Sequence, residues 1–305
     1  MTITPVPLPL RGWQAYWSEL LMLAGILVYM ANYVMGRYKN QRLAQSFFDT
    51  HWALLEENFS LVGDTTGRGA GVDNDNMSIQ GSPINFQKVS DSIFQIWCSG
   101  RACCEGMLVE LKLLKRQDLI SILSTIVRPD PPPDTVRITV ELAKDELEPM
   151  VFALATKKTA VRLARELNDL SNFCGERKPQ PAEKYGLASS FAVMTELGEV
   201  ASLFLDSRTI AVVNKYHDWV HSVHLSDQFT GMKTQEPELD KDGIMKMGEP
   251  RRVLMFCLNL PISMSGNNAD VVFQELTPFL HFVFYTVDRV RRLRLSKEVT
   301  EKNLQ

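Results

Sequence analysis

The chain has 305 residues, of which 45% are hydrophobic and 23% are charged, and its formal net charge is −3. These values are ordinary for a globular protein and exclude a disordered polyelectrolyte. They also exclude a uniformly basic nucleic-acid binder, so any contact with nucleic acid would have to come from a local basic patch.

Residues 16–38 are typical of a membrane-spanning helix. Leu20–Met35 forms a mainly apolar core that Asn32 interrupts and aromatic residues flank. With those flanks the segment has about 20 residues, which at about 1.5 Å per residue cover ~30 Å, enough to cross a thin bilayer such as that of the endoplasmic reticulum. The alternative is a buried core helix, which is favoured only by Glu19, because that residue shortens the apolar run.

The charges on either side of this segment predict its orientation. Arg37, Lys39 and Arg42 follow its apolar core, whereas Arg11 is the basic residue that precedes it. Basic residues remain on the cytosolic side, so we expect residues 1–15 to be lumenal and the rest of the chain to be cytosolic. We do not expect a cleaved signal peptide, because a basic cluster and a small-residue cleavage site are both missing.

Two polar residues lie near or within the span. Glu19 is close to its outer end, and Asn32 is close to its cytosolic end. Either side chain can extend to the lipid headgroups. The alternative is that both residues contact a partner helix within the membrane, since polar groups in lipid seek hydrogen-bonding partners.

After the span, the spacing of apolar residues predicts a juxtamembrane helix in residues 39–62 that continues to about Asn58. Residues 63–90 are rich in Gly, Asp and Asn, which indicates a flexible loop. Residues 91–267 are expected to form a cytosolic domain, and residues 268–305 a long basic helix that starts a coiled coil. The expected helix carries an apolar stripe made of Leu276, Leu280, Val283, Val287 and Val290.

The order of elements in the cytosolic domain predicts an α+β fold, with a mostly antiparallel mixed sheet packed by helices, because the connections between strands are short. The expected strands are Ser92–Cys98, Met107–Leu114, 136–142, Val151–Ala155 and Val253–Leu260. The expected helices are Leu119–Ile126 with Asp118 at its start, residues 160–170, and Arg208–His221. Residues 229–251 have the composition of a linker.

A run of basic residues lies in the expected C-terminal helix. A solvated face is the simplest interpretation, and the alternatives are contact with anionic lipid headgroups or with ribosomal RNA. The run consists of Arg289, Arg291, Arg292, Arg294 and Lys297.

The cysteines and histidines are the candidates for metal chemistry. All five cysteines follow the span and are expected to be free thiols in a reducing compartment, with Cys98, Cys103 and Cys104 acting as small buried hydrophobes. On a helix, His217 and His221 would share one face, as in the HExxH zinc signature. The simpler interpretation is a cluster of half-buried imidazoles that includes His224. The sequence offers no nucleophile with a partnered base, so we expect no catalytic residue, no cofactor and no metal site.

Six segments together resemble one known family, the coiled-coil subunit of the PAT complex (calumin family) of the endoplasmic reticulum membrane. CSGRACCEGML, within the second segment, is the most distinctive. The segments are RLAQSFF (Arg42–Phe48), IWCSGRACCEGML (Ile96–Leu108), LKRQDL (Leu114–Leu119), KYGLASS (Lys184–Ser190), MTELGEV (Met194–Val200) and VHLSDQFTG (Val223–Gly231).

The resemblance implies a non-enzymatic role in membrane-protein biogenesis. Such a subunit pairs with the small membrane protein Asterix to form an intramembrane chaperone, and it joins the ribosome, the Sec translocon and other subunits of the multipass translocon. Its clients are nascent multipass membrane proteins, and its basic helices reach toward the ribosomal exit tunnel. The basic run from Arg289 to Lys297 is then the expected RNA contact.

Two departures from the family pattern matter. Members usually have a long acidic lumenal region credited with calcium binding, whereas no acidic residue precedes Glu19 here, so calcium binding is not expected. Members also continue into a long Lys/Glu-rich coiled coil beyond the position of Gln305, which leaves contact near the tunnel to the basic run. The alternative functions are a membrane-anchored metal-dependent enzyme built on the histidines and a calcium-homeostasis protein.

Overall fold

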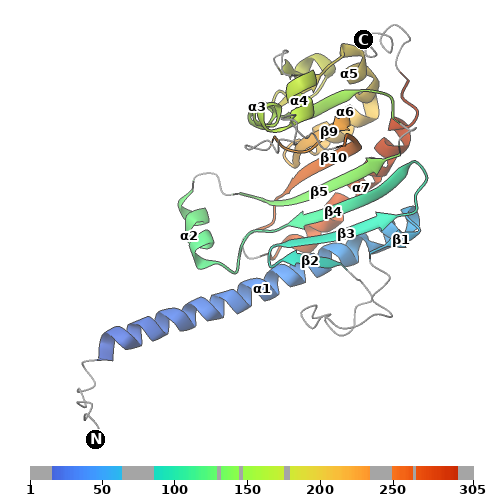
Figure 1. Cartoon of the computed structure of the whole chain (residues 1–305). Coiled ribbons are helices and arrows are strands. Elements are labelled where there is room, and N and C mark those ends of the chain that lie inside the picture. Colours follow the sequence, from blue (N-terminus) through green and yellow to red (C-terminus); the bar gives the residue numbers. More distant parts are fainter. Residues whose placement is uncertain are drawn as a thin grey trace, which may run out of the picture.

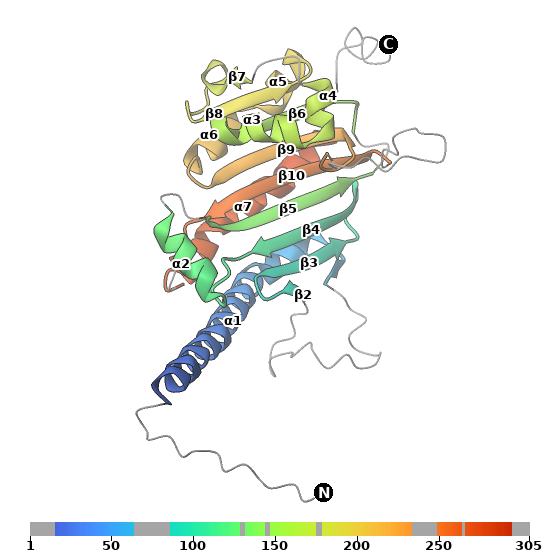
Figure 2. The ribbon, with the colours of Figure 1, turned by 60° about the vertical axis from the view of Figure 1, so that its left-hand side comes forward.

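The computed structural model describes residues 16–63, 86–128, 132–143, 147–174, 179–233, 249–263 and 266–294. A long N-terminal helix projects from a layered body that contains one large sheet and the other helices (Figure 1). A view turned by 60° shows the same projection, with the sheet seen more nearly face-on (Figure 2).

The sheet has ten strands in the order β1-β3-β4-β5-β10-β9-β6-β8-β7, with β2 paired to β3 outside this path. Each of the paired strands runs antiparallel to its neighbour. The predicted α+β class with a mostly antiparallel sheet is therefore confirmed. The strands are β1 Leu61–Val62, β2 Gln87–Ser90, β3 Ile93–Ser99, β4 Cys104–Lys112, β5 Asp134–Leu142, β6 Val151–Thr156, β7 Gln180–Pro181, β8 Phe191–Thr195, β9 Val220–Phe229 and β10 Arg251–Leu260.

The helices cover the two faces of the sheet unequally. The hydrophobic residues of α1, α5, α6 and α7 join the larger core on one face, and those of α3 and α4 join a smaller core on the other. The helices are α1 Trp17–Asn58, α2 Leu119–Val127, α3 Lys157–Glu166, α4 Asn168–Phe173, α5 Gly198–Phe204, α6 Ser207–Lys215 and α7 Ala269–Val290, and a 3₁₀ helix, η3, spans Ala182–Tyr185.

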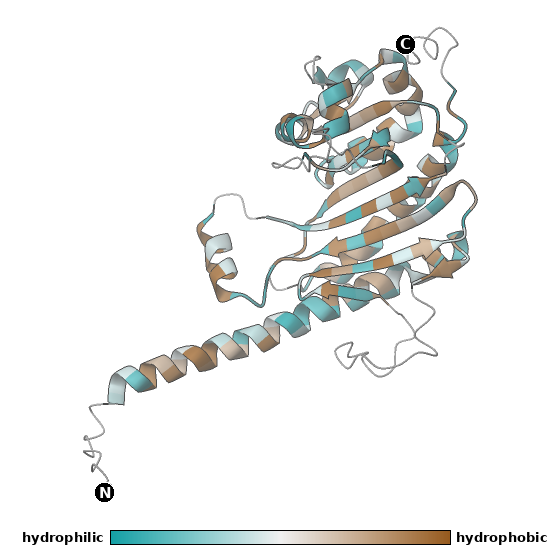
Figure 3. Cartoon of the chain, in the orientation of Figure 1, coloured by the Kyte–Doolittle hydropathy of each residue, from teal (hydrophilic) through white to brown (hydrophobic). Residues whose placement is uncertain are grey.

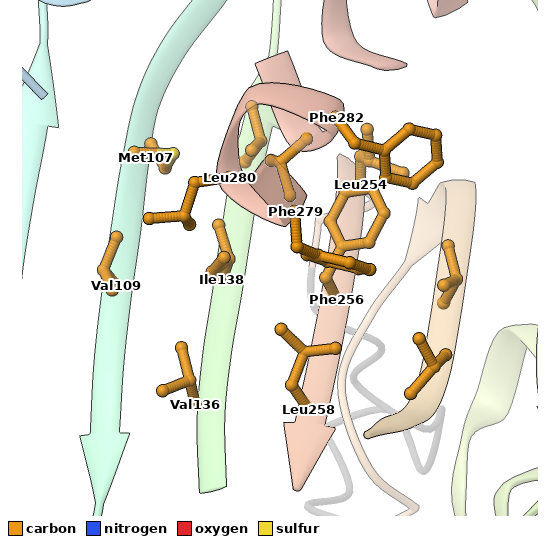
Figure 4. Close-up of a cluster of buried hydrophobic side chains, with 14 of the residues drawn as sticks. Met107, Val109, Val136, Ile138, Leu254, Phe256, Leu258, Phe279, Leu280 and Phe282 are labelled. Carbon is orange, nitrogen blue, oxygen red and sulfur yellow. The ribbon is translucent and has the colours of Figure 1, made fainter. Parts of the chain in front are cut away.

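The larger core forms where α7 crosses the central strands. Side chains from one face of β4, β5 and β10 meet Phe279, Leu280 and Phe282 of α7 (Figure 4). The period-2 alternation of β5 and β10 supplies this face, because every second residue of each strand is buried toward the helix. The apolar stripe predicted for α7 from its helical spacing is buried as expected.

Two predicted helices differ from the structure. The helix expected at Arg208–His221 is wrong in its last part, because α6 ends at Lys215 and the chain enters strand β9 at Val220. The apolar residues of β9 pair with β10 and β6 in the middle of the sheet, and this burial outweighs the local helical pattern. The helix expected at 160–170 forms as two pieces that meet at Leu167, whose backbone is extended.

The C-terminal helix α7 ends at Val290. Arg291, Arg292 and Arg294 therefore follow the helix in a turn and coil and do not extend it. Lys297 and the rest of the basic run lie outside the described residues. Most of the loop expected at 63–90 and most of the linker expected at 229–251 also lie outside them.

Helix α1 continues without a break from the exposed segment into the core, as the juxtamembrane spacing predicted. Its second half packs on α7. There the rings of Phe47 and Phe273 contact each other edge to face, with 5.3 Å between the ring centroids. His51 lies in this contact, 1% exposed, and neither of its ring nitrogens has a hydrogen-bond partner among the described residues. Burial lowers the pKa of His51 to about 4.

This buried imidazole makes stability fall with acidification. Its pKa in the folded state lies below the ordinary 6.5, so as pH falls the unfolded chain takes up a proton before the folded chain does. The stabilising term is complete above about pH 7 and is lost between pH 6.5 and 4, with about 1 kcal/mol lost by pH 5.5. We expect His51→Leu to remove that part of the change between pH 7.5 and 5.5, measured by denaturant unfolding of the detergent-solubilised chain. An identical pH dependence in both proteins would contradict this assignment.

Candidate functional site

The first half of α1 is an exposed apolar surface. Among the described residues, α1 is the helix that is long and apolar enough to cross a membrane, and little of its apolar window is buried. Figure 3 shows this hydrophobic stretch on the part of α1 that projects from the body. Its exposed large side chains are Trp17, Leu20, Leu21, Met22, Leu23, Ile26, Leu27, Val28, Tyr29, Met30, Val34 and Met35. The site described below is the junction between this surface and the folded body.

The junction is built around Asn40, which is fully buried on the inner face of α1. Its Nδ2 donates to the carbonyl oxygens of Leu114 at 2.9 Å and Asp91 at 3.1 Å, and to Oε1 of Gln117 at 3.3 Å. Its Oδ1 accepts from Nη1 of Arg116 at 3.2 Å. One amide thus satisfies groups from the β2–β3 turn and from the loop that precedes α2.

Arg116 and Asp134 form a buried ion pair beside this amide. The guanidinium donates to both carboxylate oxygens, at 3.0 and 2.7 Å, and the side chains are 4% and 0% exposed. Asp134 Oδ1 also accepts from the backbone N–H of Leu114 at 2.7 Å. A buried charge is tolerated only when it is paired and its remaining hydrogen-bonding positions are filled, and here both conditions are met.

The same loop lies directly against α1. A Cβ on Gly36 would come within 2.3 Å of the carbonyl oxygen of Arg116, so only glycine permits this close approach. One turn earlier, Nδ2 of Asn32 points at the carbonyl oxygens of Arg116 at 3.5 Å and Gln117 at 3.3 Å. The loop therefore follows α1 along more than one turn.

These contacts bear on the two polar residues of the span. The structure gives the Asn32 amide acceptors within the same chain, and Glu19 is exposed on the first turn of α1. Contact of either residue with a partner helix stays a prediction. For Asn32, such a contact would have to use the side-chain oxygen, or the Nδ2 group would have to donate to the partner as well as to the loop.

Asp91 adds a charged contact at the outer edge of the junction. It accepts from the hydroxyl of Tyr33 at 3.1 Å, and it pairs with Lys88 and with Arg37, whose Nε lies 3.4 Å away. Burial alone would raise the pKa of this carboxyl, but the hydrogen bonds and positive charges around it hold the pKa below its ordinary value. The carboxylate therefore stays charged and keeps the first basic residue after the span against the body.

The segment CSGRACCEGML contacts the C-terminal end of α1. Arg101, from the β3–β4 turn, contacts Asn58 at the end of α1 and Asp288 on α7, with its Nη2 2.8 Å from the carboxylate. Its guanidinium also lies 5.3 Å from the ring centre of Phe284. Gly106 leaves room for the ring of Trp97 on the neighbouring strand, which a Cβ would approach to 2.1 Å.

Cys98 and Cys104 of this segment are buried as predicted, whereas Cys103 is half-buried in the β3–β4 turn. All five cysteines of the chain are free thiols, as predicted. Burial raises the pKa of Cys98 to about 12 and that of Cys104 to about 11, so both thiols stay protonated. Within the described residues, no group of three His, Cys, Asp or Glu side chains converges in a way that could hold a metal ion.

The three histidines do not share a helical face, so the geometry on which the zinc comparison depended is wrong. His217 lies in the turn after α6, whereas His221 and His224 lie on β9. His224 Nε2 is 2.8 Å from Asp169 Oδ2 in a buried contact between β9 and α4. His221 faces Thr159 and Arg162 of α3. The hypothesis of a metal-dependent enzyme required these histidines to act together as metal ligands, and their positions do not allow this.

The structure separates the predicted RNA-contact residues. Arg289 is held inside the body, with Nη1 2.6 Å from Asp206 Oδ1 and hydrogen bonds to the carbonyl oxygens of Leu203 and Phe204. Arg291, Arg292 and Arg294 are exposed, and Arg294 lies 3.6 Å from Glu148. Lys297 lies outside the described residues. RNA contact by this run stays a prediction.

The residues of the junction, Asn40, Arg116 and Asp134, were not singled out from the sequence. A signal for Asn40 was present, because it falls in the series Gly36, Asn40, Leu43, Phe47 on the buried face of a helix. A polar residue in such a stripe requires a hydrogen-bond partner. The identity of that partner, 76 residues away, cannot be read from helical spacing.

Comparisons with known proteins give one consistent result. A family model described as PAT complex subunit CCDC47 matches residues 15–305. PAT complex subunit CCDC47 of Xenopus laevis is 41% identical over 303 residues, which are 99% of this chain and 58% of that protein. The Homo sapiens protein of the same name is 40% identical, over 99% of this chain and 59% of that protein. The chain thus spans somewhat less than three fifths of the length of these curated relatives.

One solved structure also overlaps with the chain. The mycobacterial trehalose monomycolate transport factor A, TtfA, has 11% identity and a TM-score of 0.27, with 77% of this chain and 93% of that chain covered. A TM-score this low does not establish a common fold.

The close approach at Gly36 can be tested with a matched glycine in the same helix. Gly36→Ala should push the loop at Arg116 away and lower stability by about 1–3 kcal/mol, since overpacking forces the backbone to shift. Gly25→Ala is the control, because a Cβ there meets nothing within 4 Å, and it should be neutral or stabilise α1 by up to about 1 kcal/mol. Unfolding of both full chains in detergent, followed by circular dichroism, measures the difference. Equal stabilities would show that the loop does not lie against α1 as described.

Proposed function

The chain belongs to the PAT complex subunit CCDC47 family, and from this premise we propose that it is a non-enzymatic subunit of an intramembrane chaperone complex. The complex would act at the ribosome-bound translocon, where it assists the insertion and folding of multipass membrane proteins. Its proposed partners are Asterix, the ribosome, the Sec translocon, the other multipass translocon subunits and the nascent clients. The proposed location is the membrane of the endoplasmic reticulum, with the N-terminus lumenal and the folded body cytosolic.

The observation that carries this proposal is the rigid junction between the span and the body. No linker separates them, because the exposed apolar half of α1 and its buried half belong to one helix. The apolar surface is open to other membrane helices, while Asn40, Arg116 and Asp134 fix its direction relative to the sheet. This geometry suits a scaffold that holds a membrane partner at a set orientation to a cytosolic assembly.

The surroundings of the histidines and cysteines support a role without catalysis. The side chains with shifted pKa values in the sheet are engaged in contacts between elements. His221 faces α3, where burial and then the charge of Arg162 lower its pKa, and Cys98 is enclosed in the core. Groups with perturbed pKa values are candidates for an active site when they lie together in a cleft.

Association with partners is the direct test of the proposal. The chain, extracted from microsomes in mild detergent at low salt, should co-sediment with ribosomes and co-purify with a small membrane protein. Phosphate contacts weaken as salt rises, so the ribosome-bound fraction should fall steeply between about 50 and 200 mM salt. Recovery of a free monomer alone at low salt would count against the proposal.

The exposed arginines after α7 give a second test. Arg291→Glu with Arg292→Glu should weaken ribosome binding about tenfold at low salt, since two phosphate contacts are replaced by repulsion. The control is Lys157→Glu with Lys158→Glu, an equal charge change on exposed residues of α3. Sedimentation at several salt concentrations measures the change, and equal binding by both double variants would remove the RNA assignment.

Arg289 is unsuitable for the same test. Its reversal would place a carboxylate beside Asp206 and strip hydrogen bonds from the carbonyl oxygens of Leu203 and Phe204. The resulting loss of binding would report a damaged fold.

A further inference from the structure

Helix α2 exposes its apolar side chains to solvent in the structure. None of its residues is buried, and Ile120, Leu123, Ile126 and Val127 are 76%, 65%, 71% and 76% exposed. The helix itself was predicted from the spacing of its apolar residues, and Asp118 caps its start by accepting from the N–H of Ile120. The apolar side nevertheless faces away from the sheet. To be shielded from water, it has to contact a group other than the described residues.

The place of α2 along α1 indicates what covers it. The loop that leads into α2 touches α1 at Asn32 and Gly36, and it is tied to Asn40 one turn later. On α1, the large exposed aliphatic residues end at Met35, the first basic residue is Arg37, and the exposed aromatic residue Tyr38 follows. From Trp17 to Gly36 is about 20 residues, or ~30 Å of helix, the thickness of the hydrocarbon layer. The loop therefore meets α1 at the boundary between hydrocarbon and headgroups.

The direction of α2 fits that boundary. In both ribbon views α2 runs across α1 and not along it (Figures 1 and 2). If α1 crosses the bilayer, a helix across it lies in the plane of the membrane. This is the attitude of an interfacial amphipathic helix, which buries one apolar side among the acyl chains near the headgroups.

The remaining groups of α2 are compatible with this environment. The hydroxyl of Ser121 donates to Asp118 Oδ2 at 2.7 Å, and that of Thr125 donates to the carbonyl oxygen of Ser121 at 2.7 Å. These donors are thus satisfied within the element, as hydroxyls near lipid have to be. Two exposed basic residues, Lys115 and Arg128, precede and follow the helix, and long basic side chains of this kind can extend to lipid phosphates.

We propose that α2 inserts the side chains of Ile120, Leu123, Ile126 and Val127 into the same leaflet from which α1 enters the body. The chain would then hold the bilayer at two points, the span and an interfacial helix, joined by the Asn32–Asn40 contacts. The body could not rotate freely about α1, because rotation would pull α2 out of the lipid. This inference rests on α1 crossing a membrane and is independent of the proposed chaperone role.

A depth measurement on the full chain tests the proposal. Leu123→Cys, labelled with an environment-sensitive fluorophore, is placed in phosphatidylcholine nanodiscs that carry nitroxides on the acyl chains near the headgroups. The control is Val271→Cys, which replaces another exposed apolar residue, on α7. The native cysteines are buried or half-buried, and the labelled parent chain supplies the background signal. We expect quenching at position 123 to exceed that at position 271 several-fold.

A second variant separates lipid contact from simple proximity. Ile120→Ser, Ile126→Ser and Val127→Ser, introduced together with Leu123→Cys, remove the apolar surface but leave the contacts of Arg116 with Asn40 and Asp134. Quenching at position 123 should then fall several-fold while the unfolding profile of the body is unchanged. Equal quenching at positions 123 and 271 in nanodiscs that contain the chain alone would overturn the proposal. A blue shift in the fluorescence emission of the label at position 123 that arises only when a purified partner subunit is added would also overturn it. The apolar side of α2 would then bind protein.

Discussion

The buried pair between Arg116 and Asp134 is the interaction on which the arrangement of the molecule depends. Removing each charge from water costs several kcal/mol, which only a close partner and complete hydrogen bonding offset. Asn40 and the N–H of Leu114 complete that hydrogen bonding. Asp134 begins β5 near the middle of the sheet, Arg116 precedes α2, and Asn40 lies on α1. One cluster of polar groups therefore joins the sheet, the loop before α2 and the long N-terminal helix.

Because of this cluster, α1 is held in a fixed direction relative to the body and is not flexibly linked to it. Its 42 residues correspond to ~63 Å of helix, with one half exposed and the other packed on α7. Arg101 holds the inner end of the helix and the Asn32–Asn40 contacts hold its middle. A partner bound to the exposed half therefore keeps a set direction relative to the sheet, and a force applied to the body is transmitted to the membrane segment.

Local patterns predicted the elements whose pattern and environment agree. The alternation of β5, the stripe of α7 and the start of α2 at Asp118 follow from spacing and capping alone. The prediction of a helix through His221, with His217 and His221 on one face, failed because β9 is defined by its neighbours β10 and β6. A short apolar run between polar residues fits either a helix or a strand. The junction was missed for a related reason. The partners of Asn40 lie at least 51 residues away, and helical spacing says nothing about contacts at that distance.

Three of the six segments by which the chain resembles its family lie where elements contact one another. CSGRACCEGML supplies Arg101, which links α1 to α7, and LKRQDL supplies Arg116, which links α1 to the sheet. VHLSDQFTG supplies His224, which holds α4 against β9, and Asp227, which accepts from the N–H of Met150 just before the neighbouring strand β6. An enzyme gathers its unusual residues around one cleft, where they act on a common substrate. Here each unusual residue fixes the position of a different element, so what the sequence specifies most strongly is the mutual orientation of span, loop and sheet. That orientation is the property a scaffold has to keep, because its partners bind to different elements and meet only through it.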